Sequence, residues 1–147
     1  MIIQLAKPTD LSAVEECAHQ AYEMYVPRIS KKPAPMIADF GSQISRHILH
    51  ILKDGTQVIG FIVFYPHEDH MHIENVAVLP KSQGNGYGTK LIEFAEHEAK
   101  HLGFGKVELY TNEKMTENIV YYPTIGYEEI GRWKEDGFKR IYFRKNL

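Results

Sequence analysis

Three glycines occur within five positions, at Gly84, Gly86 and Gly88, in the segment LPKSQGNGYGTKLIEF (residues 79–94). The residues after them favour a helix, so the glycines precede a predicted helix start. Each glycine costs ~0.5–1 kcal/mol of conformational entropy relative to alanine. Such a cluster therefore indicates that backbone N–H groups approach a ligand closely. A helix N-terminus has unpaired N–H groups and a positive dipole end, so a phosphate is the expected ligand.

Two general phosphate-binding motifs fit this segment poorly. A Walker loop ends in Gly-Lys-Ser/Thr, whereas the order here is Gly88-Thr89-Lys90. The dinucleotide motif Gly-x-Gly-x-x-Gly needs one residue more than the segment has. Glu108 lies ~20 residues further on, like the ribose-binding acid of that motif, but it falls early in its predicted strand. The strand before the glycines also ends an antiparallel meander, where a βαβ unit would be required.

The wider segment IENVAVLPKSQGNGYGTKLIEFAE resembles the acetyl-CoA-binding segment of the GCN5-related N-acetyltransferase (GNAT) family. In that family an apolar strand end, here Val76-Ala77-Val78, leads into a Gln/Arg-x-x-Gly-x-Gly/Ala turn, here Gln83 to Gly88. A second segment, TNEKMTENIVYYPTIGYEEIGR, resembles the family's Asn…Tyr-x-x-x-Gly-Phe/Tyr helix and following strand. Met115 stands where the family usually has an asparagine. The resemblance covers most of the chain and is weakest over residues 22–50.

The resemblance implies one N-acetyltransferase domain over residues 1–147, with acetyl-CoA as cosubstrate and no metal. The glycine turn would hold the pyrophosphate, and the strand before it would bind the pantetheine arm through its backbone, as an added strand does. In the second segment, Asn118 would contact the arm from the other side, and Tyr121 would pack near the cofactor. The residues assigned to the cofactor in this way are Val76, Ala77, Val78, Gln83, Gly84, Asn85, Gly86, Tyr87, Gly88, Thr89, Asn118 and Tyr121.

Acetyl transfer to an amine poses two proton-transfer problems. An alkylammonium of pKa ~10 must lose a proton before it attacks, and the coenzyme A thiolate must gain one. Tyr122 aligns with the family's tyrosine and is the predicted acid, with Tyr121 as the alternative. Glu74 is the predicted base, directly or through water, because period-two alternation puts it on one strand face with Val76 and Val78. Glu108 is the runner-up.

Hydrophobic periodicity and turn signals predict a mixed α/β (α+β) fold with a mostly antiparallel sheet of about seven strands. The resemblance adds four flanking helices and two central parallel strands that splay apart. Asp-Gly pairs predict two hairpins, and Leu91, Ile92, Ala95, Ala99 and Leu102 form the predicted buried stripe of the long helix. The predicted strands are residues 2–5, two runs in 46–66, 70–79, 106–111 and two runs in 127–145. The predicted helices are residues 7–25, residues 36–44, a long helix that the glycine turn opens and Gly103 and Gly105 end, and residues 117–124.

The composition limits the class of protein. With 147 residues, 44% hydrophobic residues and a net charge of −2, the chain has the profile of one globular domain and lacks the basic surface of a nucleic-acid binder. Cys17 is the single cysteine and is predicted to lie in the core rather than act as a nucleophile. No signal-peptide or membrane-spanning pattern occurs, so a cytoplasmic protein is expected. Trp133 and the last hairpin suggest a homodimer interface.

Two charged clusters have open interpretations. His67, His70 and His72 lie beside acidic residues, and a solvated hairpin tip is preferred over a metal site. Arg28, Lys31 and Lys32 could attract an acidic acceptor, although an exposed face without a specific role is preferred. The leading function is transfer of acetyl to an amine of a small molecule, peptide or protein. The alternative is a catalytically silent acyl-CoA sensor.

Overall fold

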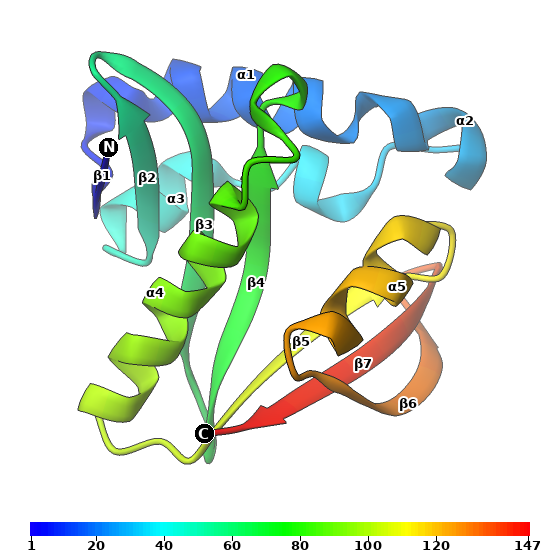
Figure 1. Ribbon diagram of the computed structural model, residues 1–147. Helices are drawn as coiled ribbons and strands as arrows, with labels where there is room; N and C mark the ends of the chain where they lie inside the picture. Colours follow the sequence, from blue (N-terminus) through cyan, green and yellow to red (C-terminus); the bar gives the residue numbers. More distant parts are fainter.

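A single twisted sheet of seven strands runs through the computed structural model, which describes residues 1–147, in the order β1-β2-β3-β4-β5-β7-β6 (Figure 1). Neighbouring strands are antiparallel except β4 and β5, which are parallel. The predicted class of sheet is therefore confirmed. The strands are β1 Ile2–Leu5, β2 Leu49–Asp54, β3 Gln57–His67, β4 His70–Val78, β5 Lys106–Asn112, β6 Glu128–Glu135 and β7 Phe138–Asn146.

The two parallel strands separate after a short paired stretch. β4 pairs with β5 only from Met71–Val107 to Ile73–Leu109, although both strands continue beyond these pairs. β5 instead stays paired with β7 along its whole length. The sheet consequently opens into a V between β4 on one side and β5 with β7 on the other (Figure 1).

Helices cover the two faces of the sheet unequally. The α-helices are α1 Leu11–Tyr22, α2 Val26–Ile29, α3 Phe40–Ser45, α4 Tyr87–His101 and α5 Thr116–Thr124, and the 3₁₀ turns are η1 Pro8–Asp10, η2 Glu23–Tyr25, η3 Ala34–Met36 and η4 Pro80–Ser82. Phe61 of β3 contacts Phe40 of α3, whereas Phe64 contacts Phe94 of α4. Side chains an odd number of positions apart on one strand point to opposite faces of the sheet. Phe61 and Phe64 are three positions apart, so α3 and α4 lie on opposite faces. α1 packs on β3 and β4 beside α3.

The core follows from the patterns of the sequence, with a few local differences. β3 is buried along most of its length, as a central strand should be. Cys17 is buried, as predicted. Leu102, predicted in the buried stripe of α4, is 56% exposed because α4 ends there and the chain turns away at Gly103, whose φ is +87°. Residues 26–36, whose three prolines predict a loop, contain α2 and η3.

No helix of the chain is both long enough and apolar enough to cross a lipid bilayer.

Candidate active site

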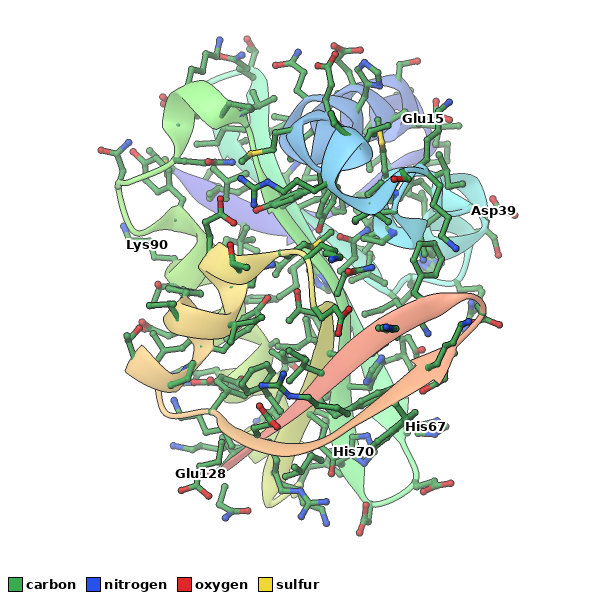
Figure 2. All side chains as sticks on the ribbon, turned by 90° about the vertical axis from the view of Figure 1, so that its right-hand side faces the viewer. Glu15, Asp39, His67, His70, Lys90 and Glu128 are labelled. Atoms are coloured by element: carbon green, nitrogen blue, oxygen red, sulfur yellow. The ribbon has the colours of Figure 1, made fainter.

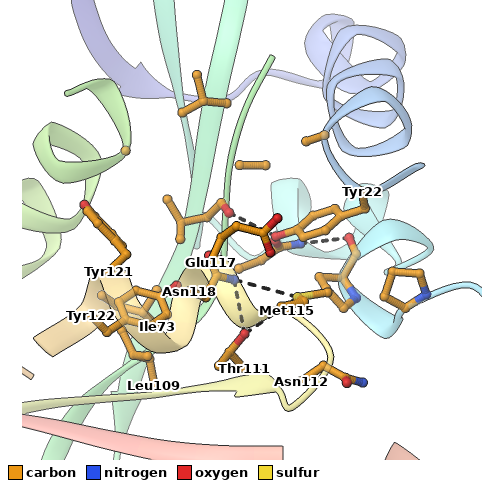
Figure 3. Close-up of a pocket in the computed structure, with 18 of the residues that line it drawn as sticks. Tyr22, Ile73, Leu109, Thr111, Asn112, Met115, Glu117, Asn118, Tyr121 and Tyr122 are labelled. Atoms are coloured by element: carbon orange, nitrogen blue, oxygen red, sulfur yellow. Dashed lines mark hydrogen bonds between the residues drawn. The ribbon is translucent and has the colours of Figure 1, made fainter. Parts of the chain in front are cut away.

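A cavity of about 670 Å³ lies where β4 and β5 diverge, between α1, the start of α4, and α5. Figure 3 shows Tyr121 and Tyr122 on one side of it and Tyr22 on the other. The cavity is lined by every residue that the sequence predicted for the site except Asn85. The Asn85 side chain is turned back toward the chain, and its amide donates to the Ser82 carbonyl at 3.0 Å. One hollow thus collects predicted residues that are up to 48 positions apart, from Glu74 to Tyr122.

The glycine turn presents free backbone amides at one end of this cavity. Gly86 precedes the first residue of α4 with φ at +80°, and Gly84 has φ at +83°, a conformation that side chains disfavour. A Cβ built at either glycine would have no atom within 4 Å. The first helical hydrogen bond runs from the Lys90 N–H to the Gly86 carbonyl at 3.0 Å. The N–H groups of residues 87–89 therefore have no partner inside the helix.

The edge of β4 that faces the gap also presents backbone groups. The Leu79 N–H donates to the Ile59 carbonyl at 2.8 Å, so every second residue of β4 bonds β3. The backbone groups of the alternate residues, Val76 and Val78, therefore point toward the gap. Side chains bond both of their carbonyls: the Tyr22 hydroxyl lies 2.9 Å from the Val76 oxygen, and the Gln83 amide lies 3.0 Å from the Val78 oxygen.

A β-bulge places Glu74 on a different face from the one predicted. Ile73 pairs with Phe64 and Asn75 with Val63, so Glu74 is the extra residue of β4. The bulge reverses the alternation, and the prediction that Glu74 shares a face with Val76 and Val78 is wrong. The Val78 side chain lies beside α4, 4.0 Å from a Cβ built at Gly88, whereas Glu74 lies on the face of α1.

The Glu74 carboxylate is held by three donors. His72 Nε2 lies 2.7 Å from Oε2, and the hydroxyls of Tyr65 and Tyr110 donate to it at 3.2 Å each. Burial disfavours the charged carboxylate, but the hydrogen bonds from His72, Tyr65 and Tyr110 outweigh burial, so the pKa of Glu74 lies below its ordinary value. Glu74 is therefore an anion at neutral pH, with its side chain 30% exposed to the cavity and solvent.

Glu108, the runner-up for the base, is committed elsewhere. Its Oε2 accepts from Arg144 Nε at 3.0 Å and Nη2 at 2.9 Å, and it lies 3.8 Å from His70 Nδ1. Glu108 does not line the cavity. The geometry therefore favours Glu74 over Glu108 for any role in the cavity.

The two tyrosines of α5 differ in their surroundings. Tyr122 is 6% exposed, packs against the rings of Tyr121, Tyr127 and Phe143, and donates no hydrogen bond to the protein. Burial is the main reason that the pKa of Tyr122 is raised above its usual range. Tyr121 is half-buried, and its hydroxyl hydrogen-bonds Thr89 of α4. Tyr122 thus keeps its proton at neutral pH and has a hydroxyl available to a ligand.

Asn118 also faces the cavity from α5. Its amide donates to Thr111 Oγ1 at 3.1 Å and lies 3.7 Å from Met115 Sδ. These contacts join the first turn of α5 to the end of β5. They leave the Asn118 side-chain carbonyl without a protein donor.

The histidine cluster is less exposed than predicted. His67 and His70 lie side by side at the end of the β3–β4 hairpin (Figure 2), with ring centroids 5.6 Å apart. His67 is exposed, but the His70 and His72 side chains are only 8% and 14% exposed. The prediction of a solvated tip therefore fails for these two, and His72 instead supports Glu74.

The basic loop after α1 also has a structural role that the sequence did not indicate. Arg28 forms two hydrogen bonds to the Glu117 carboxylate of α5, at 2.7 and 2.9 Å. Lys31 Nζ donates to the Gly137 carbonyl at 2.8 Å. The loop is thereby joined to α5 and to the β6–β7 hairpin, across one side of the cavity.

Several cavity residues had no signal in the sequence. Tyr22, Tyr110 and Arg140 line the cavity, yet they lie on α1, β5 and β7, far apart in the chain. Their residue types and spacing resemble those of ordinary helix and strand positions. Only the register of β5 with β7, in which Tyr110 opposes Tyr142 and Asn112 opposes Arg140, brings the last two together.

Comparisons with known proteins agree with this geometry. Residues 12–127 match the sequence model of the Acetyltransferase (GNAT) family. The Xenopus tropicalis protein named Probable N-acetyltransferase 14 is 30% identical over 105 residues, which cover 69% of this chain and 51% of that protein. Aminoalkylphosphonate N-acetyltransferase of Salmonella typhimurium is 31% identical over 90 residues, 56% of this chain and 57% of that protein. The chain thus spans little more than half the length of these curated relatives.

A solved structure has the same fold over nearly the whole chain. The PaiA N-acetyltransferase of Thermoplasma acidophilum, crystallised in complex with coenzyme A, superposes with a TM-score of 0.82. The alignment covers 99% of this chain and 98% of that one at 14% identity.

Proposed function

This chain belongs to the acetyltransferase (GNAT) family, and from that premise we propose that it transfers the acetyl group of acetyl-CoA to a primary amine. The proposed active unit is one domain spanning residues 1–147. One observation carries the proposal: an anion-binding helix start, an open strand edge, a carboxylate and a free phenol all line one cavity.

The cofactor would lie along the V between the strands. The pyrophosphate would accept from the backbone amides of the turn from Gln83 to Thr89, at the positive end of the α4 dipole. Each such bond to a charged group contributes ~1.5–3 kcal/mol, so three or four would supply much of a micromolar affinity before the cost of association. No metal is needed for this contact.

The pantetheine arm would extend β4. The backbone groups of Val76 and Val78 point into the gap that β5 leaves, so an extended amide chain could bond them as a strand does. Ala77 lies between them. Asn118 and Tyr121 would face the arm from α5, where both line the cavity.

Two side chains would handle the protons. The amine nitrogen attacks the acetyl carbonyl carbon, a C–N bond forms, and the C–S bond breaks with its electron pair on sulfur. The Tyr122 hydroxyl, protonated at neutral pH, would give its proton to the thiolate. The ammonium proton would pass to Glu74, directly or through water. The same negative charge would attract the ammonium form to the site.

The acceptor would be a primary amine of a small molecule or of a peptide or protein. The name of the Salmonella relative refers to a small aminoalkylphosphonate, which supports a small acceptor. The alternative function, a sensor that binds acyl-CoA without catalysis, uses the same cavity. Membership of the acetyltransferase family and the presence of Glu74 and Tyr122 in the cavity together favour the enzyme.

Two measurements test the proposal. Calorimetry with acetyl-CoA should give saturable heat, and a panel of polyamines, amino acids, aminoglycosides and peptides should release coenzyme A thiol with at least one member. Binding without thiol release on any amine would favour the sensor. No binding at millimolar acetyl-CoA would refute both functions.

A further inference from the structure

Arg140 is a buried cation that the proposed chemistry leaves unused. It lies on β7 opposite Asn112, is only 7% exposed, and lines the cavity. Its guanidinium lies 4.3 Å from the ring centroid of Tyr110 and 5.7 Å from that of Phe138. The aromatic rings hold the guanidinium in place without using its N–H donors.

The hydrogen-bonding capacity of Arg140 is not satisfied by the protein. Its guanidinium has five N–H donors, and none donates a hydrogen bond to a protein acceptor. The nearest carboxylate oxygens, on Glu135 and Asp136, lie 3.7 and 3.6 Å from Nη1, beyond hydrogen-bond distance. Glu135 is also engaged by the indole N–H of Trp133 and by the Tyr142 hydroxyl.

The carboxylates of Glu135 and Asp136 balance part of the charge of this guanidinium, but they leave its N–H donors without hydrogen bonds. A guanidinium bonds carboxylate and phosphonate groups through two parallel N–H donors, so an oxyanion in the cavity would engage donors that the protein leaves free. Arg140 therefore has the burial, the free donors and the position of an anion-binding group in the cavity.

Tyr110 fixes the distance between this cation and the proposed amine site. Its hydroxyl donates to Glu74 at 3.2 Å, and its ring lies beneath the Arg140 guanidinium. The negative Glu74 and the positive Arg140 are thus separated by roughly one tyrosine side chain along the same wall. This separation suits a short molecule with an ammonium group at one end and an anion at the other.

We propose that the acetyl acceptor is a small amine that also carries an oxyanion, with its ammonium group at Glu74 and its carboxylate or phosphonate at Arg140. This inference rests on the proposed acetyltransferase function and narrows its substrate class.

The test compares acceptors that differ only in the anion. The probes are β-alanine, its neutral amide and aminoethylphosphonate, each assayed for coenzyme A release with saturating acetyl-CoA. The wild-type protein should prefer the two anionic acceptors to the amide by about 10- to 100-fold in kcat/KM, the effect of one bond to a charged group. The ratio between β-alanine and aminoethylphosphonate then identifies which oxyanion the site favours.

Variants locate the preference at one side chain. Arg140→Gln should raise KM for the anionic acceptors to the level of the amide, while Arg140→Lys should restore part of the preference. Arg132→Gln is the matched control, because Arg132 lies on the neighbouring strand, is 56% exposed at its side chain and pairs with Glu129 outside the cavity. It should leave all three acceptors unaffected.

The outcomes separate this inference from the proposed function. The inference is overturned if the amide and β-alanine are acetylated with equal kcat/KM, or if Arg140→Gln changes kcat/KM for both acceptors by the same factor. The proposed acetyltransferase function stands in either case. Should no amine be acetylated, calorimetric titration of β-alanine into the coenzyme A complex still decides the point. Binding that Arg140→Gln abolishes supports the anion site, and absence of binding overturns it.

Discussion

Gly86→Ala is the sharpest test of the proposed pyrophosphate site, because the chain offers a matched control on the same helix. Gly86 precedes α4 and lines the cavity, and Gly103 follows α4 at its other end. Their φ angles are +80° and +87°, and a Cβ built at either meets no atom within 4 Å. Alanine therefore brings the same backbone strain to both positions and a steric clash to neither.

The effect on stability should be equal for the two variants. A left-handed conformation costs a non-glycine residue roughly 1–2 kcal/mol, and loss of unfolded-state freedom returns about 0.4–1 kcal/mol. A net decrease of about 1 kcal/mol in the free energy of unfolding lowers Tm by about 2–4 °C in a chain of this size. Thermal denaturation without ligand should give this shift for Gly86→Ala and Gly103→Ala alike.

The effect on acetyl-CoA binding should differ between them. A methyl group at Gly86 stands beside the free amides of residues 87–89, so it displaces a phosphate from one or two of them. Each bond is worth ~1.5–3 kcal/mol, which corresponds to about 10- to 100-fold in Kd. Calorimetry should show this loss for Gly86→Ala and none for Gly103→Ala. Equal affinities in the two variants would refute the claim that the turn holds the pyrophosphate.

Further predictions concern the acid, the base and the cysteine. Glu74→Gln should lower kcat/KM by about 10²-fold or more, the usual contribution of a general base, whereas Glu108→Gln should leave it unchanged; unaltered turnover of Glu74→Gln across pH 6–9 would remove Glu74 from the mechanism. Because the pKa of Glu74 is lowered in the folded protein, its charge stabilises the fold above the ordinary glutamate pKa and this stabilisation is lost as pH falls through the lowered value. Denaturant unfolding should therefore show a gap between wild type and Glu74→Gln at pH 7 that closes in acid. Tyr122→Phe should slow single-turnover transfer while acetyl-CoA affinity stays constant, and a large loss of affinity would mean that Tyr122 is structural. Burial raises the pKa of Cys17 to about 12, so a thiol reagent at pH 8 should label it only after unfolding, and rapid labelling of the native protein would contradict its placement in the core.

The sequence alone predicted the features that depend on neighbours along the chain. Two Asp-Gly pairs gave both hairpins, because a tight turn constrains the residues beside it. The glycine cluster located the start of α4, since backbone freedom and helix propensity are local properties. The resemblance assigns Val76 and Val78 to the pantetheine arm; their backbone groups point into the gap beside β4, and their contact with a cofactor stays a prediction.

The tertiary structure decided how distant segments meet. One extra residue in β4 moved Glu74 to the other face, and nothing in the local pattern marks a bulge that exists only relative to β3. The burial of His72 and Arg140 depends on strands β5 and β7, whose pairing with the rest of the sheet is not encoded in the spacing of either strand. Proximity across a sheet is set by register and by the splay of β4 from β5. For this reason the sequence could indicate the cofactor turn, while the groups proposed to select the acceptor became visible only in the folded chain.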